Sequence, residues 1–147
     1  MDIKISPKVK YLNSMLCSID NAYQLLLQSK NLSDNDYAVL FAILELGEGC
    51  VQKDIASASY ISKKTINSTI KKFERDNLVE LKAGKYPNMH LYFTEKGKKY
   101  VVENILPLIN FENEFMESIP DNEFEQMFET YLKYIKIFKQ SVENSNL

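Results

Sequence analysis

Apolar residues near the start of the chain recur at steps of three and four, the spacing of one face of an α-helix. Pro7 suits the first turn of such a helix, because its missing N–H would have no partner there. The spacing predicts a helix over about residues 7–30. Its apolar stripe consists of Val9, Leu12, Leu16, Ile19, Tyr23, Leu26 and Leu27.

A second helix is predicted after Ser33, a residue type that favours the N-cap position. Asp34 and Asp36 fall in its first turn, where acidic side chains favour the positive end of the helix dipole. Gly47 is expected to end the helix. Its inward positions are predicted to be Tyr37, Leu40, Phe41 and Leu44.

Two short helices are predicted over residues 51–78. Val51, Ile55 and Ala56 mark the first. After a brief turn, Ser62 is the expected N-cap of the second, and Asn77 is its expected C-cap. The buried stripe of this second helix consists of Ile66, Ile70 and Phe73, spaced i, i+4 and i+7.

A hairpin follows, with strands predicted over residues 78–82 and 89–93 and a turn that contains Gly84 and Pro87. The order of helix, helix, turn, helix and hairpin is that of a winged helix-turn-helix. The predicted fold class is therefore mainly α with a small β-hairpin wing.

The last third of the chain is again helical in pattern. Thr94 is the expected cap of a helix that continues through Tyr100, Val101 and Ile105, and Pro107 is expected to kink or divide it. A final helix is predicted to begin near Pro120 and Asp121. Its apolar positions are Phe124, Met127, Phe128, Tyr131, Leu132, Ile135 and Phe138.

Composition supports a single soluble, helical domain. The chain has 147 residues, of which 45% are hydrophobic and 26% charged, and only four are glycine and four proline. No stretch reaches the ~18 apolar residues of a membrane span, and no apolar signal region follows the N-terminus. Cys17 and Cys50 cannot build a disulfide framework, so we expect a cytoplasmic protein.

Charge divides the chain into unlike parts. Residues 51–100 hold eleven bases and five acids, a net charge of +6, whereas the rest holds seven bases and fifteen acids, a net charge of −8. A basic segment between acidic ends indicates that the middle of the chain meets a polyanion.

The helix that follows Ser62 carries the candidate chemistry. Asparagine can pair with adenine in the major groove, serine and threonine can contact several base edges, and lysine neutralises phosphates. An ordinary solvated helix face is the alternative interpretation, but the preceding short helix and the following hairpin favour DNA. The predicted outward set is Lys63, Lys64, Thr65, Asn67, Ser68, Lys71 and Lys72.

Lys82 and Lys85 flank the turn of the hairpin and are predicted to reach phosphates or the minor groove beside that helix. Solubilising charges on an exposed edge strand are the alternative.

The segment from Val51 to Tyr100 resembles the DNA-binding domain of the MarR family of bacterial transcriptional regulators. The resemblance rests on Ile55-Ala56, Ile61-Ser62, the step from Phe73 to Val79, and the run LYFTEKG that ends at Gly97. It implies that the recognition-helix contacts of the family fall on Ser62, Lys63, Lys64, Thr65, Asn67 and Ser68. Family wings usually carry an Asp-Arg pair, whereas this chain has Lys85-Tyr86-Pro87 and no arginine there.

The two end helices have apolar and aromatic faces too wide for one small domain to cover, which indicates an interface. The resemblance implies dimerisation helices in residues 1–32 and 101–147, around a DNA-binding domain in residues 33–100. It further implies a homodimeric regulator, most often a repressor, on a pseudo-palindromic operator. A small-molecule effector is expected between the dimer helices and the DNA-binding domain.

Other functions fit the sequence less well. Cys17 lies near Tyr11 and Tyr23, and a branch of the family senses peroxide through such a cysteine; a buried apolar cysteine is the alternative. His90, the single histidine, cannot support His-rich zinc sites or most catalytic triads. We therefore expect no enzyme activity, no metal and no cofactor. A winged-helix interaction module that does not bind DNA remains the second interpretation.

Overall fold

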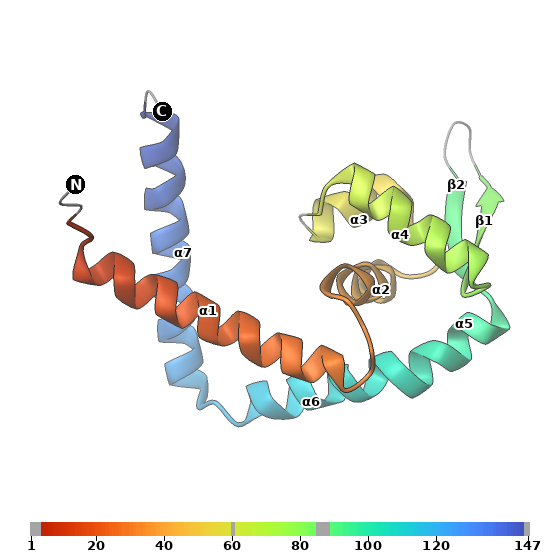
Figure 1. Cartoon of the computed structure of the whole chain (residues 1–147), viewed down its shortest axis with the longest axis horizontal. Coiled ribbons are helices and arrows are strands. Elements are labelled where there is room, and N and C mark those ends of the chain that lie inside the picture. The colour runs from red at the N-terminus through yellow and green to blue at the C-terminus, as the bar shows by residue number, and fades with distance from the viewer. Residues whose placement is uncertain (1–3, 60, 85–88, 146–147) are drawn as a thin grey trace. The chain divides into compact units, whose positions relative to one another are not determined.

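The computed structural model of the chain describes residues 4–59, 61–84 and 89–145, and it is mainly helical with one antiparallel hairpin (Figure 1). This confirms the predicted fold class. In chain order the elements are α1 (Pro7–Gln28), α2 (Asp34–Leu46), α3 (Gln52–Ser59), α4 (Lys63–Arg75), β1 (Val79–Ala83), β2 (Met89–Phe93), α5 (Glu95–Tyr100), the π-helical turn η1 (Val101–Ile105), α6 (Leu106–Glu117) and α7 (Asp121–Glu143).

Local signals set the start and end of α2. The Ser33 hydroxyl accepts a hydrogen bond from the backbone N–H of Asp36 at 3.2 Å, as predicted for an N-cap. Gly47 ends the helix with a φ of 84°, a value that suits glycine. The prediction that Phe41 points inward was wrong, because its side chain is 39% exposed. Tyr37 and Leu40 are buried as predicted, and Val39, Ala42 and Ile43 fill the rest of the core side of α2.

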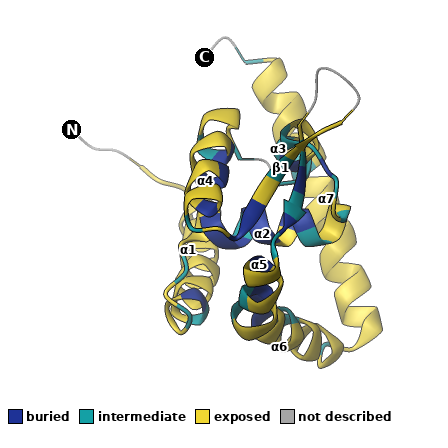
Figure 2. Ribbon diagram, turned by 90° about the vertical axis from the view of Figure 1, so that its right-hand side faces the viewer, coloured by how far each residue is buried: buried dark blue, intermediate teal, exposed yellow. Residues whose placement is uncertain are grey.

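The hydrophobic core lies where α2, α3, α4, the hairpin and η1 meet (Figure 2). Burial of one such aliphatic side chain stabilises the fold by about 1.5–3 kcal/mol, so this core is the main source of stability for the segment from α2 to η1. Its fully buried large side chains are Val39, Leu40, Ile43, Ile55, Ile66, Ile70, Leu91 and Ile105.

The hairpin pairs Val79 with Phe93 and Ala83 with Met89. A third segment, around Gly49 and Cys50, that the sequence pattern did not predict joins its second strand. Gly49 donates to the carbonyl of Leu91 at 2.7 Å, and the Leu91 N–H donates to the carbonyl of Cys50 at 2.9 Å. The chain that enters α3 is therefore hydrogen-bonded to the wing.

The predicted break at Pro107 takes the form of a change of helix type. The five residues of η1 form a π-helical turn, and α6 begins at Leu106. Pro107 has no N–H with which to bond the carbonyl of Glu103, four residues earlier. The ammonium group of Lys30, from the loop between α1 and α2, donates to that carbonyl at 3.1 Å.

Two compact units divide the chain, Met1–Leu108 and Ile109–Leu147, and the boundary falls within α6. In the first unit, Leu27 is the buried side chain of α1. In the second, α7 follows Pro120 as predicted, and none of its described side chains is buried. None of the helices in the described ranges has the length and apolar character to span a membrane.

Candidate nucleic-acid interface

Helix α4 has one buried face and one exposed face (Figure 2). Ser62 caps it as predicted, its hydroxyl accepting from the N–H of Thr65 at 3.2 Å. The predicted stripe of Ile66, Ile70 and Phe73 is buried, and Thr69 is buried with it. The exposed face carries most of the predicted set: Ser62, Lys63, Lys64, Asn67, Ser68 and Lys71.

The hydroxyl groups on this helix already take part in its own hydrogen bonds. Ser62 Oγ lies 2.8 Å from Thr65 Oγ1, and Ser68 Oγ donates to the carbonyl of Thr65 at 2.7 Å. The amide of Asn67 is exposed and has no hydrogen-bond partner among the described residues. In contrast to Ser62 and Ser68, Asn67 therefore has its full hydrogen-bonding capacity available within the described part of the chain.

Lys63 and Lys64 occupy the first turn of α4, and no acidic residue accompanies them there. Positive charges at a helix N-terminus oppose the helix dipole, at a cost of roughly 0.3–1 kcal/mol each. An anion bound in front of this turn would remove the conflict.

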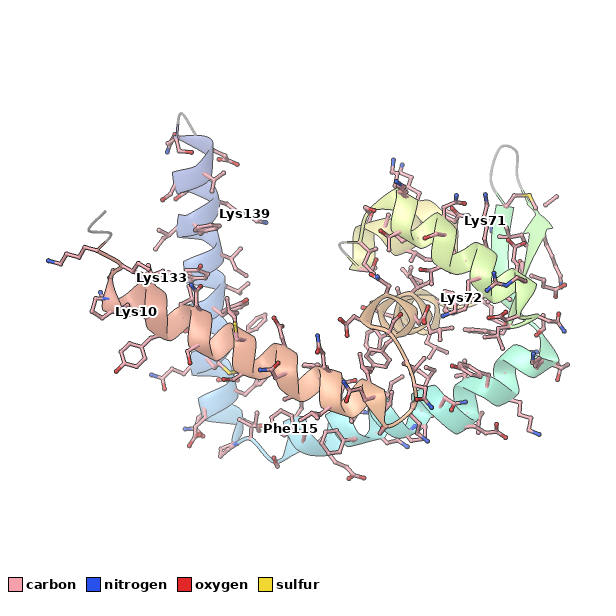
Figure 3. All side chains as sticks on the ribbon, viewed as in Figure 1. Lys10, Lys71, Lys72, Phe115, Lys133 and Lys139 are labelled. Atoms are coloured by element: carbon pink, nitrogen blue, oxygen red, sulfur yellow. The ribbon has the colours of Figure 1, made fainter. Side chains whose placement is uncertain are left out.

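Lys71 and Lys72 are neighbours in sequence with different surroundings (Figure 3). Lys71 is exposed on the side of α4 away from α2. The Lys72 ammonium lies 2.5 Å from Oδ2 of Asp36 on α2. Of these two lysines, only Lys71 has an ammonium group outside an ion pair in the described part of the chain.

On the wing, Lys82 forms an ion pair with Glu80, with 2.7 Å between Nζ and Oε1. Its ammonium also lies 5.0 Å from the centre of the Tyr92 ring. The hydrogen bond to Glu80 raises the pKa of Lys82, so this lysine is positively charged at neutral pH. Lys85, the other predicted wing residue, lies outside the described residues.

The third segment at the wing is held by a side chain as well. His90 Nδ1 lies 2.5 Å from the carbonyl oxygen of Gly49. The ring is half-buried, as the alternation along β2 predicted. Among the described residues, no group of three or more His, Cys, Asp and Glu is placed to hold a metal ion.

The C-terminal end of α4 is tied to the start of α5. The helix ends at Arg75, one residue before the predicted position, and Asp76 caps it while Asn77 adopts a φ of 58°. Lys96 donates to the carbonyl of Asp76 at 2.8 Å, and Thr94 donates to the carbonyl of Asn77 at 2.6 Å. These bonds join α4 and α5 within the first unit.

The two cysteines are free and differ in burial. Burial, followed by the charge of Asp54, raises the pKa of the Cys50 thiol, which makes it an inert packing group. Cys17 is exposed on α1, so the alternative of a buried apolar cysteine was wrong for the chain taken alone. Its redox role stays a prediction.

Helix α1, in the first unit, exposes an apolar surface, of which Tyr11 is 79% and Leu25 70% exposed. Helix α7, in the second unit, does the same along its length (Figure 2). Its aromatic rings lie in rows, with 6.1 Å between the centres of Phe124 and Phe128 and 5.9 Å between those of Tyr134 and Phe138. Surfaces of this kind usually meet a partner.

A buried stripe on α4, a short helix before it and a hairpin after it define a winged helix-turn-helix protein. Residues 30–85, which hold most of this winged-helix segment, match the model of the MarR family. The resemblance noted in the sequence is thereby confirmed.

Solved structures of MarR family regulators share the fold over most of the chain. NMB1585, a MarR family regulator from Neisseria meningitidis, is 20% identical, with a TM-score of 0.81 over 95% of this chain and 100% of that one. MepR of Staphylococcus aureus, in complex with DNA, is 17% identical, with a TM-score of 0.74 over 90% of this chain and 99% of that one.

A third structure, the PcaV transcriptional regulator from Streptomyces coelicolor in complex with its natural ligand, is 14% identical to this chain. Its TM-score is 0.70 over 91% of this chain and 98% of that one. No curated protein sequence matches the chain. At these identities the likeness shows the fold alone.

Proposed function

We propose that the chain is a sequence-specific DNA-binding transcription regulator, and that the exposed face of α4 enters the major groove. The observation that carries this proposal is the pair of lysines in the first turn of α4, placed against the helix dipole beside Asn67. Phosphate groups in front of that turn would satisfy both lysines. The MepR–DNA complex, which has the same fold, supports this assignment.

The exposed residues of α4 fall into two groups: those that bind the phosphate backbone of the DNA and those that contact base edges. Lys63, Lys64 and Lys71 bind phosphates in this proposal. Asn67 pairs with adenine, since its amide can donate and accept at once. The hydroxyl groups of Ser62, Thr65 and Ser68 already form hydrogen bonds within the helix. Each keeps a free acceptor position, through which it makes a weaker contact with the DNA. Lys82 and Lys85 place the wing against the phosphates.

The functional unit in this proposal is a homodimer on a pseudo-palindromic operator, acting as a repressor. The apolar surfaces of α1 and α7, exposed in the single chain, support a partner of the same kind. A two-fold dimer would set two α4 helices about one turn of DNA apart, so that each chain reads one half-site.

Asn67→Ala and Lys71→Ala should have different effects on operator binding. Loss of the Asn67 amide should reduce discrimination at one base pair by about tenfold, within the range known for bidentate pairs. Loss of the Lys71 charge should weaken binding to every sequence and lower the slope of log affinity against log salt by about 0.9. Fluorescence anisotropy with the protein's own upstream DNA and a scrambled duplex measures both quantities.

Glu129→Ala, on α7 and exposed, is the matched control and should leave both quantities unchanged. If the unsubstituted protein binds its upstream DNA no more tightly than scrambled DNA, the interaction-module interpretation replaces this proposal.

We further propose that an effector binds between α1 and α2, where a cavity of about 360 Å³ is lined by Asp20, Tyr23, Gln24, Leu27, Asp34 and Tyr37. Two carboxylates and two phenol rings favour a cationic aromatic compound, which gains both charge attraction and cation–π contact. The ligand-bound PcaV structure supports a ligand site in this fold.

Asp20→Asn should weaken the binding of a cationic aromatic dye by about two- to fivefold, the loss expected for one exposed charge. Dye fluorescence titration measures this change, and Asp121→Asn, on α7 and outside the cavity, provides the control. Equal dye affinity for the Asp20→Asn variant and the unsubstituted protein would contradict the effector assignment.

A further inference from the structure

The ammonium group of Lys72 points from α4 towards α2, not towards the face proposed to meet DNA (Figure 3). Its partner Asp36 is nearly enclosed, with a side chain 9% exposed, whereas the side chain of Lys72 is 45% exposed. Around the axis of α4, Lys71 follows Asn67 by about 40° and Lys72 follows it by about 140°. Lys71 therefore shares the face of Asn67, and Lys72 does not.

The Asp36 carboxylate is fixed in the first turn of α2. Its own backbone N–H donates to the Ser33 hydroxyl at 3.2 Å, so the main chain that carries it is capped. Removing the partner of a buried carboxylate strongly destabilises the folded protein, because a buried negative charge is left unpaired. The pair between α2 and α4 is therefore a specific contact and not a mobile surface ion pair.

The charge of Asp36 also reaches Tyr100, at the end of α5. The pKa of the Tyr100 hydroxyl is raised by burial first and then by that charge. Together with the bonds from Lys96 and Thr94 to the C-terminal end of α4, the ion pair restrains α4 from two sides.

We propose that Lys72 is a positioning residue that, through Asp36, fixes the rotation of α4 about its own axis. This inference rests on the proposed DNA binding. In the fixed rotation, Asn67 and Lys71 face the groove together. Without the pair, the buried stripe of α4 still packs in the core, but a small rotation of the helix becomes easier and Asn67 meets its base in a poorer geometry.

The test compares the operator affinity of Asp36→Ala with that of the unsubstituted protein. Lys72 could either position α4 or bind a phosphate, and these two roles predict opposite changes in that affinity. If Lys72 positions α4, Asp36→Ala lowers operator affinity by about tenfold, or ~1.4 kcal/mol, and lowers the ratio of operator to scrambled-DNA affinity. If Lys72 binds phosphate, the same substitution releases a lysine and removes a negative charge. Operator affinity then rises, and that result overturns the proposal.

Lys71→Met and Lys72→Met form the matched pair for the salt dependence. The Lys71 substitution should lower the salt slope by about 0.9, and the Lys72 substitution should leave the slope unchanged while it lowers the specificity ratio. Lys72→Arg, which keeps the ion pair, should restore the ratio. A slope that falls equally in both Met variants would overturn the positioning role.

Circular dichroism shows whether each variant is folded. If Asp36→Ala unfolds, Asp36→Asn takes its place, because the amide oxygen still accepts a hydrogen bond from Lys72. The direction of the change in operator affinity is then tested with a smaller expected effect. Failure of the unsubstituted protein to prefer its operator would overturn both the function and this inference. A preference for the operator, combined with higher affinity in the Asp36 variants, would overturn this inference alone.

Discussion

Gly97→Ala should destabilise the first unit by about 3 kcal/mol or more, although alanine is the better helix former by ~1 kcal/mol. A Cβ at position 97 would lie 1.8 Å from the carbonyl oxygen of Leu78 and 2.8 Å from its carbonyl carbon. Both atoms belong to the main chain between α4 and β1, so neither can move away by a change of rotamer.

The surrounding hydrogen bonds leave this joint little freedom to adapt. The Leu78 carbonyl accepts from the N–H of Thr94 at 3.1 Å, and the Thr94 hydroxyl accepts from the N–H of Gly97 at 3.0 Å. An added methyl group would separate α5 from this carbonyl and break the cap. Urea unfolding followed by circular dichroism measures the loss.

Lys99→Ala, at an exposed position two residues further along α5, is the control and should change stability by no more than about 0.5 kcal/mol. A Gly97→Ala protein as stable as its parent would show that the close approach of α5 to Leu78 does not exist in solution.

Replacing Phe128 and Phe138 together by glutamate should convert the proposed dimer into a monomer of 17.1 kDa. In the single chain these side chains are 52% and 57% exposed, although each stacks on another aromatic ring of α7. Burial of each in a partner would contribute about 1.5–3 kcal/mol. Two buried glutamates would instead require desolvation of two negative charges.

Loss of the dimer should weaken operator binding by a factor of about 10²–10⁴. In a dimer, binding of one subunit to its half-site raises the effective concentration of the other subunit at the second half-site, and a monomer lacks this gain. Sedimentation velocity measures the mass, and anisotropy measures the affinity. Glu129→Lys on the same helix changes charge without adding or removing apolar surface, and should leave the dimer intact. An unsubstituted protein that sediments as a stable monomer at micromolar concentration would contradict the proposed assembly.

Most features of the fold that the sequence predicted correctly depend on residues close together in the chain. Ser33, Ser62 and Thr94 all cap the helices that they were expected to cap, because an N-cap depends on a side chain and a backbone group within three residues. The exposed positions on α4 follow from its apolar period in the same way. Once Ile66 and Ile70 were assigned to the core, the outward residues were determined.

The features that the sequence did not predict depend on contacts between distant segments. The periodicity placed Lys72 at the side of α4 but could not show Asp36, 36 residues earlier, in front of its ammonium group. The bond between Gly49 and Leu91 likewise joins segments far apart in the chain, with no alternating pattern to announce a strand. Phe41 was misplaced because four neighbouring positions on α2 were enough to fill the core.

The hydrogen bond from Lys30 to the carbonyl of Glu103 makes the helix around Pro107 depend on a distant part of the chain. The donor comes from 73 residues away, so the turn before the proline is completed only after the chain has brought its beginning and its later part together. A synthetic peptide of residues 95–117 would contain the proline without that donor. The hydrogen bond that the Glu103 carbonyl receives from Lys30 thus exists only in the folded unit, whereas the π-helical turn itself is formed by local backbone bonds.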